Sequence, residues 1–407
     1  MRLAACLSLA LAFGCSAESP APVGADGGAW ETYRAQWSRP DAGAPLAFVT
    51  NSRQNSVAIL DLSARRVLTT LPVPVVPLAE NGPHHLAIDP VRRVIYTPLS
   101  MPAPVTSPGP HGDHGLASVT GIFVKRDLYT LRLLGQVEVD PNPGEMVLSH
   151  DRRRAYVSHF DMARALANVG DREGQLSNVI EIDVDRMTVL RRIPVCVAAH
   201  GMALSADDRT LYVACTGDDA LGVVDLSTTP AGVRVVTLTE GAQPASGSPI
   251  FAPYALAMSP DGRRVWVGLS ANMNRALVAF DTAAGRWDPA RILRQFPGYP
   301  WFPGFSADGS TLIVPTQNQN AVVMLRDGDT PSVLRTERYD EATCALPHQV
   351  SLGPDGLYYL VCEGVWSSQR QTPGNVLALH PDDLRIVARY DVGFVPDAIV
   401  FDPAVAP

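Results

Sequence analysis

Nine histidines and six cysteines are the side chains of this 407-residue chain best suited to metal or redox chemistry. Neutral imidazoles are good ligands for Zn, Cu and Fe, and cysteines in an oxidising compartment pair as disulfides. The histidines stand at positions His84, His85, His111, His114, His150, His159, His200, His348 and His380. They form no local metal motif such as His-Glu-x-x-His. Any metal site must therefore be assembled by the fold from distant segments.

Several classes of protein are disfavoured by what the sequence lacks. It contains no Gly-x-Ser-x-Gly elbow, no Cys-x-x-Cys-His haem attachment and no glycine-rich phosphate loop. These absences argue against a serine hydrolase, a covalent c-type cytochrome and a nucleotide enzyme. A content of 46% hydrophobic and 18% charged residues excludes a disordered or collagen-like chain. The formal net charge of −8 argues against nucleic-acid binding.

The N-terminus has the layout of a secretory signal. Arg2 precedes an apolar stretch over residues 3–13, and the small residue Gly14 stands before the expected cut. The apolar stretch is too short to span a bilayer. We therefore predict a signal peptide over residues 1–14 and an exported protein.

The segment that follows the signal is expected to be a lipid-anchor or linker segment over residues 15–44, because it is rich in Ala, Gly, Pro and Asp. The residues before Cys15 resemble a bacterial lipobox, which implies that Cys15 becomes the lipidated first residue. Ala12 and Phe13 depart from the commonest lipobox pattern. Simple cleavage without lipidation is the alternative.

A repeat organises the rest of the chain. The pattern of residues 200–215, an apolar run, an Asp-centred turn and a second apolar run, recurs at residues 254–268. The same frame fits seven times, at intervals of about fifty residues. Its first positions are His84, Gly144, His200, Tyr254, Trp301, His348 and Asp397. Self-similarity at this period indicates stacked supersecondary units.

Each unit contains four short β-rich runs, which is the content of one propeller blade. Six units are complete, and the segments 46–73 and 395–402 supply the strands of a seventh. Pairing these two ends closes the ring and hides the edges that an open array exposes. We therefore predict an all-β fold, a seven-bladed β-propeller over residues 45–407. Each blade has four antiparallel strands, and N-terminal strands pair with the C-terminal strand to close the ring.

The repeats also carry a family resemblance. The Pro-His openings, the run ALSADDRTLYVACTGDDALGVVDL and the run AMSPDGRRVWVGLS resemble the YVTN-type repeat of bacterial extracytoplasmic seven-bladed propellers. The resemblance covers nearly all of the predicted propeller and implies the same fold. It implies no single activity, because this family and its relatives include binding proteins, haem-handling proteins, lactonases and metal enzymes.

The blade geometry converts sequence positions into a map. First strands begin, and strands two and three are joined, on the same face of the disc, here called the upper face. Seven of the nine histidines map to this face, all except His150 and His380. His84, His200 and His348 are repeat-equivalent and belong to blades two, four and seven, counted from the closing blade. Because first strands line the central channel, we expect these three imidazoles to converge on one axial metal ion.

Two further histidines extend this predicted metal set. The loop over residues 100–118 contains His111 and His114, which we expect to fold over the mouth of the channel and add ligands. His85 alternates to the other side of its strand, and we expect it to serve packing. The alternative for the whole set is structural, because histidines at a strand start also pack and bond backbone carbonyls. Zn, Cu and Fe all fit such ligands.

Other upper-face positions are candidates for binding a ligand. They are His159, Tyr254, Trp301 and Asp397, with Glu145 beside Gly144. Aromatic residues at such positions can equally plug the channel. Residues 161–170 are expected to form a short helix above blade three, with Asp161 as its N-cap.

Four cysteines remain once the first two are removed with the signal or by lipidation, and an even number suggests two disulfides. The repeat favours the pairs Cys196–Cys215 and Cys344–Cys362. The first cysteine of each pair lies four residues before an inward-pointing histidine. The second ends the second strand of the same blade, where the antiparallel neighbour brings the two ends together. The alternative is metal ligation through Cys-x-x-x-His, which needs reduced thiolates.

These observations give three hypotheses for function. The first is an exported, lipid-anchored, monomeric binding protein that presents its upper face to a small ligand, a metal or an envelope protein. The second is a copper or iron oxidoreductase, or a metal-dependent hydrolase, with its metal in the central channel. The third, non-covalent haem binding, follows from the family resemblance alone. All three place the protein in the periplasm or on the outer membrane, with membrane contact only through the anchor.

Overall fold

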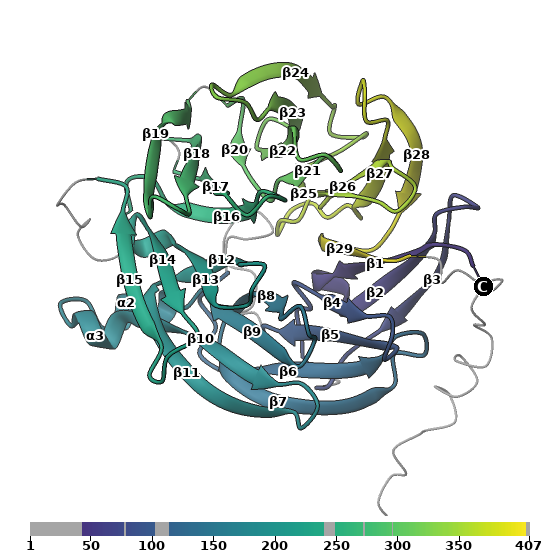
Figure 1. The fold of residues 1–407 in the computed structure, drawn as a ribbon. Coiled ribbons are helices and arrows are strands. Elements are labelled where there is room, and N and C mark those ends of the chain that lie inside the picture. The colour runs from purple at the N-terminus through teal and green to yellow at the C-terminus, as the bar shows by residue number, and fades with distance from the viewer. Residues whose placement is uncertain are drawn as a thin grey trace, which may run out of the picture. The chain divides into compact units, whose positions relative to one another are not determined.

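The computed structural model describes residues 43–76, 79–101, 114–239, 249–271, 273–294 and 296–403. Seven antiparallel sheets follow one another along this part of the chain and surround a common centre (Figure 1). The fold is the predicted all-β, seven-bladed propeller. The predicted signal peptide, Cys15 and His111 lie outside the described residues.

The blades are numbered from the one that closes the ring, and their strands are given from the channel outward. Blade one is β29 (Pro396–Asp402), β1 (Leu46–Asn51), β2 (Ser56–Asp61) and β3 (Arg66–Pro72). Blade two is β4 (Ala87–Asp89), β5 (Val94–Leu99), β6 (Thr120–Asp127) and β7 (Leu133–Pro141). Blade three is β8 (Pro143–Leu148), β9 (Arg154–His159), β10 (Leu176–Asp183) and β11 (Thr188–Val197). Blade four is β12 (Ala199–Leu204), β13 (Thr210–Cys215), β14 (Ala220–Asp225) and β15 (Gly232–Thr237).

The remaining three blades follow the same order. Blade five is β16 (Pro253–Met258), β17 (Arg264–Leu269), β18 (Ala276–Asp281) and β19 (Arg286–Leu293). Blade six is β20 (Tyr299–Pro300), β21 (Gly304–Phe305), β22 (Thr311–Gln317), β23 (Ala321–Arg326) and β24 (Ser332–Arg338). Blade seven is β25 (Pro347–Leu352), β26 (Tyr358–Cys362), β27 (Asn375–Leu379) and β28 (Ile386–Asp391). In blade six, the short strands β20 and β21 replace a single inner strand, and both pair with β22.

The ring is closed by the two ends of the propeller, as the sequence predicted. Strand β29 pairs antiparallel with β1, with Leu46 opposite Asp402. The hydroxyl of Tyr129, in blade two, donates to the Asp402 carboxylate at 2.8 Å. The closing blade is therefore tied to the next blade by a buried side-chain contact as well as by its own strand pairing.

Apolar side chains fill the spaces between neighbouring blades. One cluster joins blades seven and one through Tyr359 and Val49, and another joins blades three and four through Tyr156 and Val213. Packing of these sheet faces fixes each blade against the next. The inner strands consequently present fixed backbone positions to the axis.

Four short helical segments connect strands in the described part of the chain: η1 (Ser52–Gln54), α2 (Met162–Ala167), α3 (Arg172–Gln175) and η2 (Thr216–Asp218). The predicted helix above blade three is α2. The Asp161 side chain accepts a hydrogen bond from the Arg164 backbone N–H at 3.0 Å and caps it, as expected. None of the helices among the described residues has the length and apolar character needed to cross a membrane.

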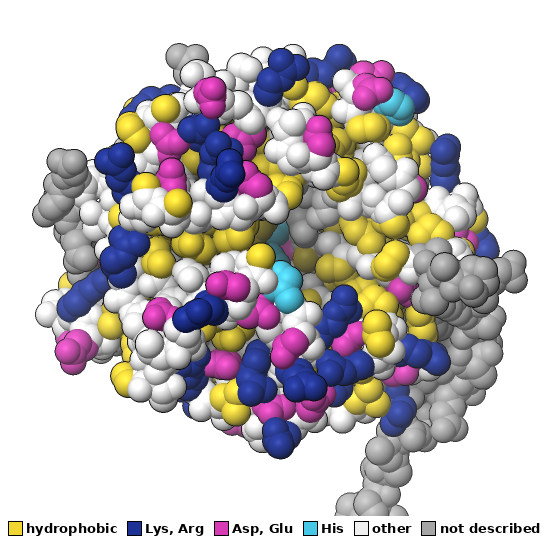
Figure 2. All heavy atoms as spheres, in the orientation of Figure 1, with side chains coloured by type: hydrophobic (Ala, Val, Ile, Leu, Met, Phe, Trp, Pro, Cys, Tyr) yellow, Lys and Arg dark blue, Asp and Glu magenta, His cyan; other side chains and the backbone are white. Residues whose placement is uncertain are grey.

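One face of the propeller is hollowed at its middle, and acidic and basic side chains are interspersed over it (Figure 2). Mixed charges of this kind create no extended field of one sign. The chemistry of the molecule is instead concentrated at the axis.

Candidate metal centre

A repeated local motif turns the chain into each inner strand. A proline directly precedes the first repeat position in six of the seven blades, at Pro83, Pro143, Pro253, Pro300, Pro347 and Pro396. A residue with a left-handed backbone lies two positions before the first repeat position, also in six blades, at Gly82, Asn142, Ala198, Ala252, Leu346 and Val395. Proline disfavours the right-handed helical conformation in the residue before it and fixes its own φ. The first repeat positions therefore enter the channel along similar paths.

Five aromatic and imidazole rings at these positions form a closed circuit around the axis. The ring centroids of His348 and Trp301 are 4.9 Å apart, and those of Trp301 and Tyr254 are 4.5 Å apart. Tyr254 stacks on His200 at 3.7 Å. His84 completes the circuit, 5.9 Å from His200 and 5.8 Å from His348. The repeat-equivalent side chains from blades two, four, five, six and seven thus meet.

The two remaining repeat positions, Asp397 and Gly144, lie in the blades between those that carry the rings. Asp397 lies between His84 and His348: its Oδ1 is 3.8 Å from His84 Nε2, and its backbone carbonyl accepts a hydrogen bond from His348 Nδ1 at 2.6 Å. Gly144 lies between His84 and His200. A Cβ at Gly144 would stand 3.0 Å from the Cδ2 atom of His200, so the absence of a side chain gives that ring its place.

His85 also belongs to the centre, and the expectation that it only packs on the opposite side of a strand is wrong. Strand β4 begins at Ala87, so His84 and His85 precede the regular alternation of side chains. Register shifts mark a bulge at the equivalent pair of residues in blades three, four, five and seven, and bulges re-aim side chains. The His85 centroid is 4.6 Å from that of His84, 6.1 Å from that of His200 and 5.1 Å from that of Phe302.

His114 reaches the centre from the loop between β5 and β6, as the map of the upper face predicted. Its ring centroid lies 4.8 Å from that of His84 and 5.2 Å from that of His200. A hydrogen bond of 2.9 Å joins its Nδ1 to the hydroxyl of Tyr254. The next residue, Gly115, has φ +83°, and a Cβ there would stand 2.4 Å from a backbone oxygen of the segment that leads into α2. Only glycine allows the loop to approach this closely.

Carboxylates approach the imidazoles from blade seven and from the closing blade. Asp397 and Glu363 are both fully buried. Glu363 Oε1 lies 3.8 Å from His348 Nε2 and accepts a hydrogen bond from Gln317 Nε2 at 2.7 Å. Because a carbonyl oxygen only accepts, His348 Nδ1 carries a proton. Its Nε2 is the ring nitrogen that faces the Glu363 carboxylate.

A third carboxylate, Glu145, follows Gly144 in blade three and accepts a hydrogen bond from the Met202 backbone N–H at 2.6 Å. Burial raises the pKa of Glu145 to about 8. Burial also raises the pKa of Tyr254 well above 10, and the charges of Glu363, Asp397 and Glu145 add to this effect. Tyr254 therefore remains a neutral phenol.

The arrangement provides two groups of potential ligands, each with atoms that all lie within 4.8 Å of one another. The first group is His84, His85 and His200, and the second is His84, His348 and Asp397. Two imidazoles bound to one ion at about 2.0–2.1 Å have ring centroids roughly 4.5–6.5 Å apart, depending on the angle at the ion. The centroid distances from His84 to His85, His200 and His348 all fall in this range. The three histidines selected by the repeat are thus near neighbours that meet through His84.

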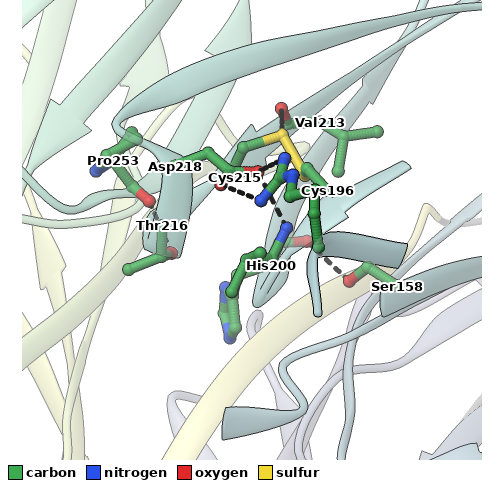
Figure 3. Close-up of a disulfide and its surroundings, with 10 residues drawn as sticks. Ser158, Cys196, His200, Val213, Cys215, Thr216, Asp218 and Pro253 are labelled. Atoms are coloured by element: carbon green, nitrogen blue, oxygen red, sulfur yellow. Dashed lines mark hydrogen bonds and ion pairs between the residues drawn. A yellow bond between two sulfur atoms is a disulfide. The ribbon is translucent and has the colours of Figure 1, made fainter. Parts of the chain in front are cut away.

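The two predicted disulfides are present, and each lies beside an axial histidine. Cys196 pairs with Cys215 at a Cα separation of 5.7 Å, and Cys344 pairs with Cys362 at 5.2 Å. Figure 3 shows the first of them next to the segment that carries His200. The alternative of Cys-x-x-x-His ligation is wrong, because these sulfur atoms are bonded to each other.

Hydrogen bonds hold the histidine-bearing segments from neighbouring strands. The Ser158 hydroxyl, at the end of the preceding blade's second strand, donates to the His200 carbonyl at 2.6 Å (Figure 3). Thr50 makes the equivalent bond to the His84 carbonyl at 3.0 Å. Asp218 accepts from the backbone N–H of Val197 at 2.9 Å, close to the first disulfide. These bonds fix the backbone from which the axial imidazoles project.

Three histidines lie away from the centre. His159 ends β9, and its Nδ1 donates to the Asn178 carbonyl at 2.9 Å. Burial lowers the pKa of His159 to about 4, so the ring is neutral. Within the described residues, no ring contact joins it to the axial histidines, although the sequence made it a candidate ligand-binding residue. His150, which bonds Asp208 at 2.6 Å, and His380 lie in turns away from the axis, as predicted.

Sequence reasoning missed several residues of the centre. Glu363 directly follows the second strand of its blade. Because the blade geometry places second-strand ends on the upper face, the sequence position of Glu363 could have predicted it. Phe160 packs 5.4 Å from the His200 and Tyr254 rings, and it likewise follows a second strand. Phe302 follows Trp301 as His85 follows His84, and only the backbone bulge reveals that this second position also faces the axis.

No protein-family profile and no curated sequence matches the chain. Among solved structures, the chain resembles a periplasmic gluconolactonase, PpgL, of Pseudomonas aeruginosa (16% identity, TM-score 0.61, covering 88% of this chain and 99% of that one). It also resembles a hydrazine synthase chain of Kuenenia stuttgartiensis (18%, 0.55, 77% and 88%). A third similar structure is the dihydro-heme d1 dehydrogenase NirN (14%, 0.53, 89% and 76%). At these identities the likeness establishes the class, a seven-bladed β-propeller, and that class includes enzymes.

Proposed function

We propose that this protein is an exported metalloprotein whose axial histidine cluster binds a transition-metal ion. The observation that carries the proposal is the convergence of His84, His85 and His200, whose ligating atoms lie within 4.8 Å of one another. All three residues are at most 6% exposed. Neutral imidazoles in such a group suit Cu, Zn and Fe ions, and the rings of His114 and His348 lie 4.8 Å and 5.8 Å from the His84 ring.

The surroundings of the imidazoles support binding over simple packing. Protein ligands to metals commonly donate their second ring N–H to an oxygen, which fixes the tautomer and the orientation of the ring. His348 does this with the carbonyl of Asp397. His114 has the hydroxyl of Tyr254 in the same role when its Nε2 carries the lone pair. A structural histidine can make the same bond to a carbonyl, so metal analysis distinguishes the two roles.

A second candidate function is redox chemistry at the bound metal. The observation that favours it is the stack of Tyr254 on His200, which puts an oxidisable phenol in contact with a ligand. Non-covalent haem has less support, because the rings at the axis pack against one another at 3.7–5.9 Å and a porphyrin would have to displace several of them. A metal-bound protein that cycles with ascorbate and ferricyanide would support the redox function, and one that stays in a single oxidation state would contradict it.

Export and a lipid anchor belong to the same proposal. The charged and apolar start of the chain, the YVTN-type repeats and two buried disulfides all suit an oxidising compartment outside the cytoplasm. One of the similar structures is itself a periplasmic protein. We place the anchor at Cys15, and radiolabelled palmitate incorporation that disappears in Cys15→Ala tests it.

Metal analysis of the purified, folded protein tests the main proposal. We expect near-stoichiometric transition metal in the wild-type protein and its loss in a variant with His84→Ala, His85→Ala and His200→Ala. Circular dichroism and a thermal transition check that the variant folds. His150→Gln is the matched control, because this exposed histidine pairs with Asp208 away from the axis. A wild-type protein that takes up no Cu, Zn, Fe or Co ion after challenge would contradict the proposal.

A further inference from the structure

The second group of ligands at the axis differs in chemistry from the first. His84, His85 and His200 offer only neutral nitrogen atoms, whereas His348 and Asp397 combine a nitrogen with a carboxylate. A second carboxylate, Glu363, stands 3.8 Å from His348 Nε2 and is held by Gln317. Mixed nitrogen and oxygen donors suit divalent ions such as Zn²⁺, Fe²⁺ and Co²⁺.

The two groups share His84 and have no other member in common, although the ring centroids of His85 and His348 are only 6.4 Å apart. In the described part of the chain, no group of mutually close ligating atoms contains both His200 and His348. A single ion requires all its ligands within about twice the metal–ligand distance, roughly 4.2 Å for imidazole nitrogens. Either group reaches this spacing from 4.8 Å with a small closure, whereas one ion that used both groups would need a larger rearrangement of the inner strands, which the blade packing and the disulfides oppose.

The charges at the axis also favour a cation at the second group. Asp397 and Glu363 are fully buried, and each places a carboxylate oxygen 3.8 Å from an imidazole nitrogen. A buried carboxylate is costly to maintain in charged form unless a cation or a metal ion compensates it. One divalent ion bound by these two carboxylates and a neutral His348 gives a site with no net charge.

We infer that the metal centre is binuclear: one ion is bound by His85 and His200, a second by His348 and Asp397 with Glu363 in reach, and His84 is shared between them. This inference rests on the proposed function. An imidazole has two ring nitrogens, and each can bind one ion. When both do so, His84 is an imidazolate bridge, and its remaining ring proton is released to solvent as the second ion binds.

Counting the ions bound by the full-length, disulfide-intact protein tests the inference. The protein is freed of metal with a chelator, titrated with Co²⁺ and examined by native mass spectrometry and absorption spectroscopy. We expect two Co²⁺ ions per chain, with one proton released beyond the first ion. Substitution Asp397→Asn should reduce the count to one. Asp402→Asn is the matched control, because this buried aspartate of the same strand contacts Tyr129 instead of the axis, and it should bind two ions.

The outcomes separate this inference from the proposal on which it rests. Saturation at one Co²⁺ ion in the wild-type protein overturns the binuclear centre and leaves the proposed metal binding intact. No bound ion overturns both. Because the wild-type count decides the matter, a failure of the Asp397→Asn variant to fold does not affect the test. A copper-loaded form adds an independent readout, since two Cu²⁺ ions joined by an imidazolate are expected to give much less EPR signal than the copper content.

Discussion

Substitution Gly144→Ala should weaken metal binding without removing any ligand. A methyl group at this position would stand 3.0 Å from His200 Cδ2 and 3.1 Å from the Ser158 hydroxyl oxygen, closer than carbon atoms normally approach. Ser158 is held by its 2.6 Å bond to the His200 carbonyl, so the imidazole has to give way by a few tenths of an ångström. Changes that disturb the orientation of a ligand typically cost 10–100-fold in metal affinity, about 1.4–2.7 kcal/mol. Competition with a chromophoric chelator measures this affinity.

The control for this substitution is Gly232→Ala at the start of the outer strand β15. A Cβ at Gly232 meets its nearest atoms at 3.6 Å and 3.8 Å, which is ordinary contact. Its metal affinity should equal that of the wild-type protein. If Gly144→Ala folds and binds metal within twofold of the wild-type affinity, then His200 is not a ligand in the position described, and the reasoning from the axial ring is refuted.

Three further predictions concern the scaffold. Replacing Cys196 and Cys215 by alanine should lower the free energy of unfolding by about 3 kcal/mol, because the disulfide closes a loop with a sequence separation of 19 residues; urea denaturation measures it. His159, whose pKa burial lowers to about 4, contributes stability that is present above pH 6.5 and lost as the pH falls toward 4. A His159→Gln variant should therefore lose less stability on acidification than the wild-type protein in thermal scans from pH 7 to 4. Deletion of residues 396–407 should expose the edge of β1 and produce oligomers in size-exclusion chromatography, and a monomeric, fully folded product would contradict the closing role of β29.

The fold was predictable because the repeat is a long-range signal that survives local ambiguity. A single run such as residues 211–214 is too short to separate a strand from a helix, but seven copies of the same frame fix both strand content and blade number. The disulfides followed for the same reason. Cys196 lies four residues before His200 at the entry to blade four, and Cys215 ends the second strand of that blade, so the repeat brings the two together.

The composition of the centre was only partly predictable, because alternation of side chains fails where the inner strands begin. His85 stands next to His84 and would point away from it in a regular strand, yet the chain enters β4 only at Ala87. The left-handed residues before the prolines include Leu346 and Val395, which have no intrinsic preference for that conformation. Their geometry is imposed by the packing of the whole ring and cannot be read from local sequence.

The position of the disulfides within the ring bears on what the protein was selected to do. Six of the seven blades enter the axis through a left-handed residue, and strand pairing and inter-blade packing hold all seven. Among the described residues, one cross-link joins the outer strand of blade three to the second strand of blade four, and the other joins the segment before β25 to the second strand of blade seven, so they lie just before His200 and His348. Trp301 and Tyr254 enter by the same route in blades that carry no such cross-link. A scaffold that needed only general stability would gain as much from a disulfide in any blade. His84 enters from blade two without a cross-link, so the disulfides fix two of the three repeat-equivalent histidine segments, which is the kind of support that a preorganised ligand set needs.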